Sequence, residues 1–460
     1  MGSTIKPLHT RQSSRLRQLA IICVLLLAIY CFLLVPNHSL DSSRTILDSS
    51  YSYPSSPHIH QSPSLEVLNN LFLTHSQCTT TFPGLTSEID TVVSKGPFTL
   101  SPSGPLGPLV ARIHNGKLSI LQWVRKSDLS ADMLAHRSAT LHQIAAALLT
   151  SPNPDEIPDT IFAFNHHDDP LSPSFSYSRP ADTALNKPSS HIFPVPHFSF
   201  YSWPLPFIGS FPRAASAITS LESTFSSPKG SWSSKIPKAI WRGTTRFNNA
   251  RAGRVRQTLL LTSSSKPWAD IEALKWVTNG HNASNALAIE DFCRYKYIIQ
   301  TEGITYSGRF QFHQLCASVV ITPPLAWMQH TTHLVRPVFS SSGFDGGNPR
   351  LAPYPAPWVK EAWPREYRAE EANIVFVAPD WSDLEATIEW LEKHPQVAEG
   401  IARRQREMFH EAGYLSPAAE MCYWRAAIRG WSKVARYEGQ GFEDVEGMPW
   451  EEFSLTEVHK

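Results

Sequence analysis

The residues of this chain that are most able to do chemistry lie in three polar segments, each of which directly follows a short apolar run. The first segment is Asn165–Pro170 and contains the adjacent carboxylates Asp168 and Asp169. The second begins at Arg242 and the third runs from Glu302 to Arg309. A carboxylate can accept a proton from an attacking hydroxyl, and arginine side chains bind phosphate oxygens in a bidentate manner. We therefore treat the three segments as one candidate site.

The first segment allows three interpretations. In the one we prefer, Asp168 is a general base, with Asp169 as its rival for that role. In the second, His166, His167 and the two aspartates are metal ligands, since imidazole and carboxylate groups suit zinc or manganese. That site needs a further ligand from elsewhere, which the sequence does not identify. In the third, the segment is a structural turn of the Asp-Pro type.

The second segment is rich in cations and contains no carboxylate between residues 238 and 256. Arg242 and Arg246 directly follow an apolar run, and Gly243 allows the close approach of a ligand to the backbone. This pattern favours the binding of a pyrophosphate. The later cations are better explained as one solvated face of a helix. They are Arg251, Arg254 and Arg256.

Alternating strands and helices must position these segments. The second half of the lumenal part alternates β and α, which predicts an α/β fold with a parallel sheet covered by helices. Ligands of such sheets bind beyond the carboxyl ends of the strands, where the three polar segments are expected to lie. The predicted strands are 160–164, 239–241, 295–300, 318–322 and 373–377. The predicted helices are 309–317, one that starts with a capping box at Ser382 and Glu385, and 397–412.

The two ends of the chain differ from its middle. Residues 1–18 are basic and 19–35 form an uncharged apolar run, which predicts a cytosolic tail and a transmembrane signal anchor of a type II protein. A cleaved signal peptide is the alternative, although no typical cleavage site follows the run. Residues 36–68 are rich in Ser and Pro and predict a stem. Residues 437–460 are acidic and predict a solvated tail.

Composition excludes several classes of protein. The 460 residues contain 41 Lys plus Arg and 40 Asp plus Glu, a formal net charge of +1, which argues against a nucleic-acid-binding protein. Hydrophobic residues make up 42% of the chain, enough to form packed cores. Six cysteines are too few for a scaffold that depends on disulfides.

Four cysteines follow the predicted anchor, an even number that allows two disulfides in an oxidising compartment. Cys293 and Cys316 flank one candidate β–loop–α unit, and Cys78 and Cys422 bracket the globular part. Of the three possible connectivities we expect 293–316 and 78–422. Buried free thiols are the alternative.

Four ordered motifs carry a resemblance to a known family. They are Trp241-Arg242-Gly243, residues 291–297 (DFCRYKY), residues 302–309 (EGITYSGR) and residues 315–320 (LCASVV). Together they resemble the CAP-type glycosyltransferases, glycosyltransferase family 90, which includes protein O-glucosyltransferases and fungal capsule xylosyltransferases. The resemblance covers about residues 78–435 and is densest between 236 and 322.

The resemblance implies a GT-B-like fold of two Rossmann-like lobes, 69–235 on the acceptor side and 236–436 on the nucleotide-sugar side. It implies inverting transfer of glucose or xylose from a UDP-sugar to a hydroxyl of a glycan or protein, with no metal and no other cofactor. The family's base falls on Asp168, and its Gly-rich turn has a cysteine pair on Cys293 and Cys316. The family's donor-binding arginines fall on Arg242 and Arg309. From the residues themselves we add Gly243, Arg246, Gly303 and Ser307 to the expected donor-binding set. Further contacts to donor or acceptor are expected from Glu302, Asp169 and Trp203.

The sequence departs from the family in two places. Thr245 occupies the position where the family often has its second arginine, and Arg246 follows it. The aromatic acceptor segment is only loosely kept in residues 197–203. A lumenal glycan-binding or scaffold protein on the same fold is the alternative function. Because the C-terminus has no KDEL-type signal, we expect a single-pass protein of the Golgi membrane, with the endoplasmic reticulum as the alternative.

Overall fold

A computed structural model describes residues 62–102, 106–225, 232–247, 253–277, 280–344, 355–442 and 444–458. The predicted cytosolic tail and the predicted anchor, Leu19 to Val35, lie outside these ranges and stay predictions. In the part of the chain that is described, no helix combines the length and the apolar character needed to cross a bilayer. Residues 59–460 form one compact unit.

The first large sheet is mixed. Its strand order is β18-β3-β2-β4-β5-β7, with antiparallel pairing from β18 to β4 and parallel pairing from β4 to β7. The strand β4 is buried along its whole length, which places it in the interior of the sheet. In sheet order the bounds are β18 (Met448–Pro449), β3 (Lys117–Trp123), β2 (Leu109–His114), β4 (Thr160–Phe164), β5 (Ser174–Ser176) and β7 (Ile192–Pro194).

The second large sheet is parallel throughout, in the order β15-β16-β13-β12-β8-β9. Parallel sheets need helices on their faces, and the apolar strands here match that requirement. In sheet order the bounds are β15 (Pro337–Phe339), β16 (Ile374–Phe376), β13 (Val319–Thr322), β12 (Tyr295–Ile299), β8 (Ile236–Gly243) and β9 (Ala269–Ala273). All five predicted strands are therefore present, β4 with the predicted bounds, and the α/β class is confirmed.

Three short strand pairs supplement the large sheets. β1 (Phe98–Thr99) pairs in parallel with β17 (Ala435–Arg436), and β10 (Trp276–Val277) pairs with β11 (Asn282–Ala283) in antiparallel fashion. β6 (Arg179–Pro180) pairs with β14 (Trp327–Met328). The last pair joins the chain after β5 to the chain after β13, so the two halves of the fold share backbone hydrogen bonds.

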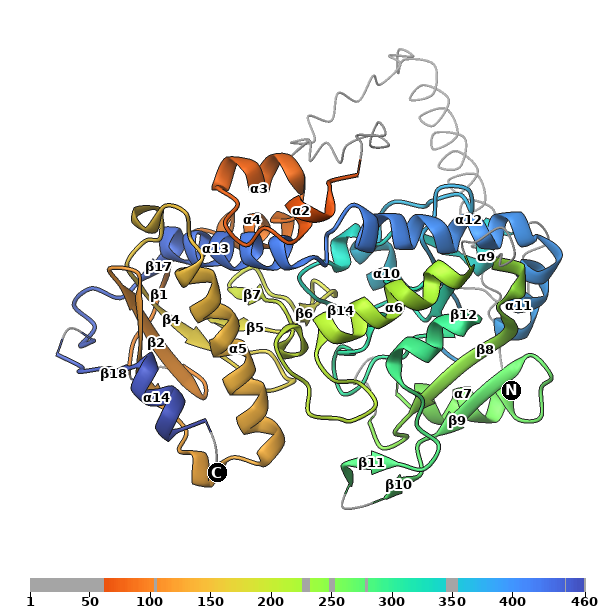
Figure 1. Ribbon diagram of the computed structural model, residues 1–460, viewed down its shortest axis with the longest axis horizontal. Coiled ribbons are helices and arrows are strands. Elements are labelled where there is room, and N and C mark those ends of the chain that lie inside the picture. The colour runs from red at the N-terminus through yellow and green to blue at the C-terminus, as the bar shows by residue number, and fades with distance from the viewer. Residues whose placement is uncertain are drawn as a thin grey trace, which may run out of the picture. The chain divides into compact units, whose positions relative to one another are not determined.

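The helices on the first sheet begin with clear capping signals. α5 (Ala131–Leu149) starts after Ser130, whose side chain accepts a hydrogen bond from the Met133 amide. α13 (Pro417–Val434) starts after Ser416 and has Pro417 in its first turn. These two helices pack on each other, and α13 also packs on the N-terminal helices (Figure 1). The N-terminal helices are α2 (Leu65–Leu68), α3 (His75–Thr81) and α4 (Ser87–Val93).

The remaining helices accompany the second sheet and its connections. α11 packs on α12, and α12 packs on β13 (Figure 1). They are α6 (Phe211–Phe225), α7 (Val255–Ser263), α8 (Phe310–His313), α9 (Ser340–Gly343), α10 (Pro357–Ala362), α11 (Leu384–Lys393) and α12 (Pro395–Arg406), which a π-helical turn, Glu407–Glu411, extends.

Two helix predictions need correction. The helix expected over 309–317 is the single turn α8, because the chain must reach β13 by residue 319. The capping box expected at Ser382 and Glu385 is wrong: the N-cap of α11 is Asp383, without a side-chain cap. The hydroxyl of Ser382 instead bonds Asp380 at 2.7 Å, and the Asp383 carboxylate accepts from the Ala378 amide at 2.9 Å.

Both ends of the described chain belong to the core, which corrects two expectations. The expected stem ended at residue 68, but Leu68 is buried in α2. The expected solvated tail instead supplies β18 and the helix α14 (Trp450–Thr456), whose Phe453 is fully buried. The tail is held there because the buried Arg137 donates a hydrogen bond to the main-chain oxygen of Glu457 at 2.5 Å. Acidic composition concealed the apolar face of this short helix.

Candidate active site

The loop after β4 presents Asp168 to solvent. Asn165 is fully buried and holds the loop in shape, because its amide donates to the main-chain oxygen of Asp169 at 2.6 Å and its Oδ1 accepts from the His167 amide at 3.2 Å. With these bonds made inside, the side chains of His167, Asp168 and Asp169 are exposed. The loop is thus an ordered turn that presents two carboxylates.

A hydrogen bond joins this loop to the Gly-rich turn after β12. The hydroxyl of Thr305 donates to the main-chain oxygen of Asp168 at 3.1 Å. The same turn is closed by the Gly303 amide, which donates to the oxygens of Thr305 and Tyr306 at 3.0 and 3.1 Å. The first and third polar segments of the sequence are therefore in contact, as expected from their positions at strand ends.

The surroundings of Asp168 make its carboxyl group more basic. Burial among neighbouring groups raises its pKa above the usual value, and the charge of Asp169 raises the pKa further, while His167 acts in the opposite direction. The negative charge of Asp168 in turn raises the pKa of the phenols Tyr177 and Tyr306, although burial is the main cause there. The Asp168 side chain is thus exposed, yet it lies near enough to Tyr177 and Tyr306 for its charge to act on both phenols.

The metal interpretation of this loop gains no further ligand from the part of the chain that the structure describes. His166 is fully buried, neither of its ring nitrogens has a hydrogen-bond partner, and burial lowers its pKa to about 3. Within the described ranges, the one metal-like grouping of side chains is Glu222 with Cys293 and Cys316. That grouping does not offer thiolate ligands, because the two cysteines form a disulfide.

Arg242 lies at the carboxyl end of β8 and is paired within the protein. Its guanidinium bonds the Asp270 carboxylate at 2.7 Å and the main-chain oxygens of Asp270 and Asn285 at 2.8 and 3.2 Å. Burial acts to raise the pKa of Asp270, but hydrogen bonds from Tyr295 and Arg242 outweigh this and lower the pKa. The positive charge of Arg242 is therefore largely used in supporting β9, while its role in donor binding stays a prediction.

Arg309 and Arg256 are two cations that no carboxylate of the described residues neutralises. Arg309 donates to the main-chain oxygen of Arg242, and burial lowers its pKa to about 10. Arg256 lies in the first turn of α7 and donates to the main-chain oxygens of Glu302 and Thr244 at 3.0 and 2.8 Å. Burial, and then the charge of Arg309, lower the pKa of Arg256 to about 9. Two neighbouring guanidiniums without a carboxylate partner among the described residues can attract an anion.

The remaining donor-binding candidates surround this pair. Gly303 lies close to Arg256: a Cβ atom there would be 3.3 Å from the Tyr306 oxygen, a tight contact, and 3.5 Å from the Arg256 guanidinium. Ser307 is buried in the same turn, and its main-chain oxygen accepts from the Phe310 amide at 3.1 Å. Gly243 gives space to the ring of Trp241, which would lie 2.4 Å from a Cβ atom. Arg246 is exposed.

A small pocket opens beside Arg242 and Arg309. Apolar side chains form most of its wall, and the two arginines form the polar part. The pocket is lined by Phe207, Ile208, Arg242, Leu274, Leu287, Ile289, Phe292 and Arg309. Its volume of about 10 Å³ has room for one water molecule, so the recess itself does not hold a larger ligand.

The three further contact residues differ in their surroundings. Both carboxylate oxygens of Glu302 accept from the Ala326 amide, at 3.1 and 3.2 Å, and one also accepts from the Trp327 amide at 3.0 Å. Glu302 therefore holds the start of β14 in place. Asp169 is exposed beside Asp168. Trp203 lies against the Gly-rich turn, since a Cβ atom at Gly308 would be 3.1 Å from its ring.

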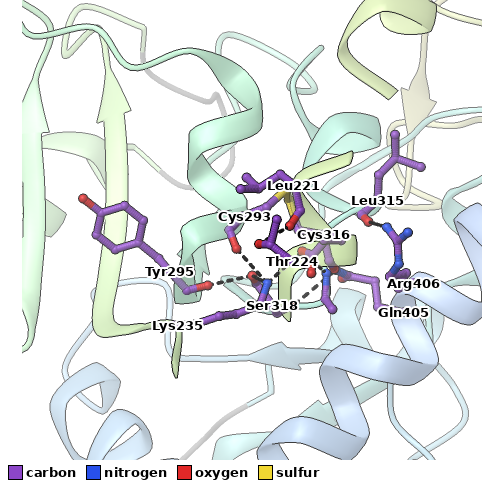
Figure 2. Close-up of polar contacts among 12 residues, drawn as sticks. Leu221, Thr224, Lys235, Cys293, Tyr295, Leu315, Cys316, Ser318, Gln405 and Arg406 are labelled. Carbon is purple, nitrogen blue, oxygen red and sulfur yellow. Dashed lines mark hydrogen bonds and ion pairs between the residues drawn. A yellow bond between two sulfur atoms is a disulfide. The ribbon is translucent and has the colours of Figure 1, made fainter. Parts of the chain in front are cut away.

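The disulfide between Cys293 and Cys316 links the segments that lead into β12 and β13. Figure 2 shows this bond among polar side chains that fasten the segment 313–318. The ammonium of Lys235 donates to the Cys293 oxygen at 2.7 Å and pairs with Glu222 at 2.7 Å. The amide of Gln405 donates to the main-chain oxygens of His313, Cys316 and Ser318, at 3.2 to 3.3 Å. The second expected disulfide, Cys78–Cys422, is also present.

One important residue was misread from the sequence. Arg256 was interpreted as part of a solvated helix face, but its side chain is only 6% exposed and lies beside Arg309. The signal that would have identified it is the apolar pattern of α7, in which Val255 and Leu259 are buried on the same side as Arg256. Arg254 is exposed, as expected, and Arg251 lies outside the described residues.

Comparison with known families gives a direct match. Residues 132–339 match the family model described as glycosyl transferase family 90. This range contains the loop of Asp168, the cation pair and the Gly-rich turn, so the resemblance expected from the motifs is confirmed.

Curated relatives agree with the family. The chain is 26% identical over 222 residues to an O-glucosyltransferase rumi homolog of Anopheles gambiae, 46% of each chain. It is 24% identical over 214 residues to protein O-glucosyltransferase 1 of Homo sapiens, 45% of this chain and 44% of the human one. It is 23% identical over 216 residues to O-glucosyltransferase rumi of Drosophila melanogaster, 45% and 43%. This chain thus matches less than half the length of each relative.

Proposed function

We propose that this chain transfers a sugar from a UDP-sugar to a hydroxyl group of a protein or glycan. The proposal starts from the match of residues 132–339 to the model of glycosyl transferase family 90. The observation that carries the proposal is that Asp168, whose pKa is raised, lies in one site with Arg256 and Arg309, two cations that no described carboxylate neutralises. Asp168 and the turn that leads to Arg309 are joined by the Thr305 hydrogen bond. Glucose and xylose are the sugars we propose for the donor.

The cation pair suits the diphosphate of the donor. Arg256 and Arg309 are held in place by main-chain oxygens, which fix the guanidiniums but do not neutralise them. A UDP leaving group gains negative charge as the bond from the sugar to the phosphate breaks, and fixed cations stabilise this charge. We propose that these arginines supply the stabilisation, and that chelation of metal ions leaves the activity unchanged.

Asp168 suits the role of the base. In the proposed step the acceptor hydroxyl oxygen forms a bond to the anomeric carbon while the bond from that carbon to the UDP oxygen breaks. The hydroxyl proton passes to the Asp168 carboxylate, and UDP leaves with the electron pair of the broken bond. A single displacement of this kind inverts the anomeric centre. The raised pKa of Asp168 makes its carboxylate a stronger proton acceptor than an ordinary aspartate.

The architecture and location that we propose follow the same family. Each large sheet is assigned to one lobe of a GT-B fold, with the acceptor on the side of the first sheet and the donor on the side of the second. Two disulfides favour an oxidising compartment, and we propose a Golgi membrane protein whose catalytic part faces the lumen. Protease protection of the full chain in sealed microsomes tests this topology.

Measuring the release of UDP tests the activity. A fragment of residues 62–460 is incubated with UDP-glucose or UDP-xylose and a mixture of acceptor glycopeptides. Release of UDP that depends on the acceptor and is lost in Asp168→Asn supports the proposal. Failure to bind UDP, or no transfer with either donor and any acceptor, would favour a glycan-binding or scaffold protein on the same fold.

A further inference from the structure

His197 is a buried imidazole at the boundary between the two halves of the site. It precedes the short 3-10 helix Phe198–Phe200 and is only 2% exposed. Its Nδ1 atom accepts a hydrogen bond from the Ser199 amide at 3.2 Å and lies 2.9 Å from the Ser199 hydroxyl. The amide of Gln311 donates to that hydroxyl at 2.8 Å and lies 3.4 Å from Nδ1.

These contacts determine which nitrogen of His197 carries the proton. A backbone amide can only donate, so Nδ1 must be an acceptor and cannot carry a hydrogen atom. Burial lowers the pKa of His197 well below its usual value, and the nearby His136 and His330 act in the same direction, so the ring is neutral. A neutral imidazole with a bare Nδ1 has its hydrogen on Nε2. His197 therefore presents an N–H donor from Nε2.

The Nε2–H group of His197 lies on the side of the ring that faces the Gly-rich turn, and no described residue accepts a hydrogen bond from it. A Cβ atom at Gly308 would lie 2.6 Å from both Cε1 and Nε2 of His197, so this edge of the ring lies against the turn just before Arg309. The ring of Tyr306, whose pKa is raised in part by Asp168, has its centroid 5.6 Å from that of His197. Nε2 belongs to the small part of this ring that reaches solvent, so its N–H group can bind water or a ligand there.

We infer that His197 donates a hydrogen bond from Nε2 to a hydroxyl oxygen of the sugar being transferred, and so contributes to the choice of donor. This inference rests on the proposed function. The two cations are available for the diphosphate, whereas a neutral N–H beside the Trp203 ring suits an uncharged hydroxyl group. The sugar being transferred would lie where the turn of the second sheet contacts the loop of the first.

Two substitutions separate the two nitrogens of the ring. In His197→Asn the side-chain oxygen takes the place of Nδ1 and still caps the Ser199 amide, but nothing replaces Nε2. In His197→Gln the amide group reaches the Nε2 position and supplies a donor, while the Nδ1 acceptor is lost. The affinities of the fragment 62–460 for UDP, UDP-glucose and UDP-xylose are measured by calorimetry for the wild type and both variants.

The expected result is selective. For His197→Asn, affinity for UDP stays within twofold of the wild type, while affinity for the preferred UDP-sugar falls about five- to tenfold. His197→Gln recovers at least part of the sugar contribution. Equal weakening of UDP and UDP-sugar would show a structural role and overturn the inference, as would unchanged affinity for both. If His197→Asn does not fold, loss of the entire sugar contribution in His197→Gln overturns it. Wild-type protein that does not bind UDP would refute the proposed function itself.

Discussion

The main-chain oxygen of Asp168 accepts a hydrogen bond from the Thr305 hydroxyl at 3.1 Å. Asp168 follows a strand of the mixed sheet, and Thr305 follows a strand of the parallel sheet. The contact therefore fixes the distance between the proposed base and the turn that leads to Arg309. Sugar transfer requires this relationship, because the acceptor oxygen and the anomeric carbon must meet in a defined geometry.

The substitution Asp168→Asn should remove activity without harming the fold. Loss of a general base lowers the rate by about 10²- to 10⁴-fold. Because burial disfavours the ionised form of Asp168 in the folded protein, removing its charge should leave the thermal unfolding midpoint at pH 7 unchanged or raised. UDP-release kinetics and calorimetry check both results. Asp169→Asn is the matched control and should keep most of the activity; the reverse pattern would move the base to Asp169.

The decrease in transfer rate at low pH should depend on the interaction between Asp168 and Asp169. The activity falls as the pH drops through the raised pKa of Asp168, because the protonated carboxyl cannot accept a proton. The Asp169 charge contributes to this raised pKa, so Asp169→Asn should move the acid limb of kcat/KM to lower pH. A profile that stays in place, or moves to higher pH, would contradict this account of the pair.

The cation pair, Arg256 and Arg309, should contribute more to the affinity for UDP than Arg246 does. Arg256→Gln and Arg309→Gln each remove charge-assisted hydrogen bonds to phosphate, with an expected loss of about 1.5–3 kcal/mol in binding free energy. Arg246 is exposed, so Arg246→Gln should change UDP affinity less than twofold. Calorimetric titration with UDP measures all three. Similar affinities in all three variants would remove the cation pair from the donor site.

Arg242 should behave differently from the cation pair. Its guanidinium bonds Asp270 at 2.7 Å, so Arg242→Gln leaves a partly buried carboxylate with its Tyr295 hydrogen bond but without its ion-pair partner. We expect the free energy of unfolding to fall by about 1–3 kcal/mol, with a smaller effect on UDP affinity than either Arg256→Gln or Arg309→Gln. Urea unfolding and titration on the same variant separate the two effects. A large loss of affinity at unchanged stability would instead assign Arg242 directly to the donor.

The acidic C-terminal segment should be required for stability. Phe453 of α14 is fully buried against the first sheet, so Phe453→Ala should lower the free energy of unfolding by about 3–5 kcal/mol. Leu455 lies in the same helix and is 83% exposed, so Leu455→Ala should change it by less than about 0.5 kcal/mol. Urea unfolding of the two variants is the measurement. Equal, small effects would mean that the segment does not pack on the sheet in solution.

Gly308 should resist substitution because of His197. A Cβ atom there would lie 2.6 Å from the imidazole and 3.1 Å from the Trp203 ring, which leaves no space for a methyl group. Gly308→Ala should lower the free energy of unfolding by about 1–3 kcal/mol. In the background of His197→Ala the same substitution should cost much less, because the obstructing ring is gone. A double-mutant cycle measures this coupling, and additive effects would show that the two residues do not touch.

Local pattern predicted much of the second sheet. The run 295–300 is strand-like and stops by Gly303, and the apolar run 318–322 is followed by Pro323. Both strands and the polar segment after the first could therefore be predicted without knowledge of their neighbours. The two disulfides could also be predicted, because four cysteines allow only three pairings and two of the cysteines flank one β–loop–α unit. The loop of Asp168 was found for the same reason: it follows the fully apolar run 160–164.

Tertiary packing decided which charges remain available. By itself the sequence determined the α/β class, the three polar segments and the family resemblance, since these depend on residues near one another in the chain. It did not show that Arg242 would meet Asp270, or that Arg256 would be buried beside Arg309. These partners come from different strands and helices, and whether a cation is neutralised depends on distances that only the folded chain sets. The acidic tail was misread for the same reason, because the surface that buries Phe453 is formed by β3, more than 300 residues earlier in the chain.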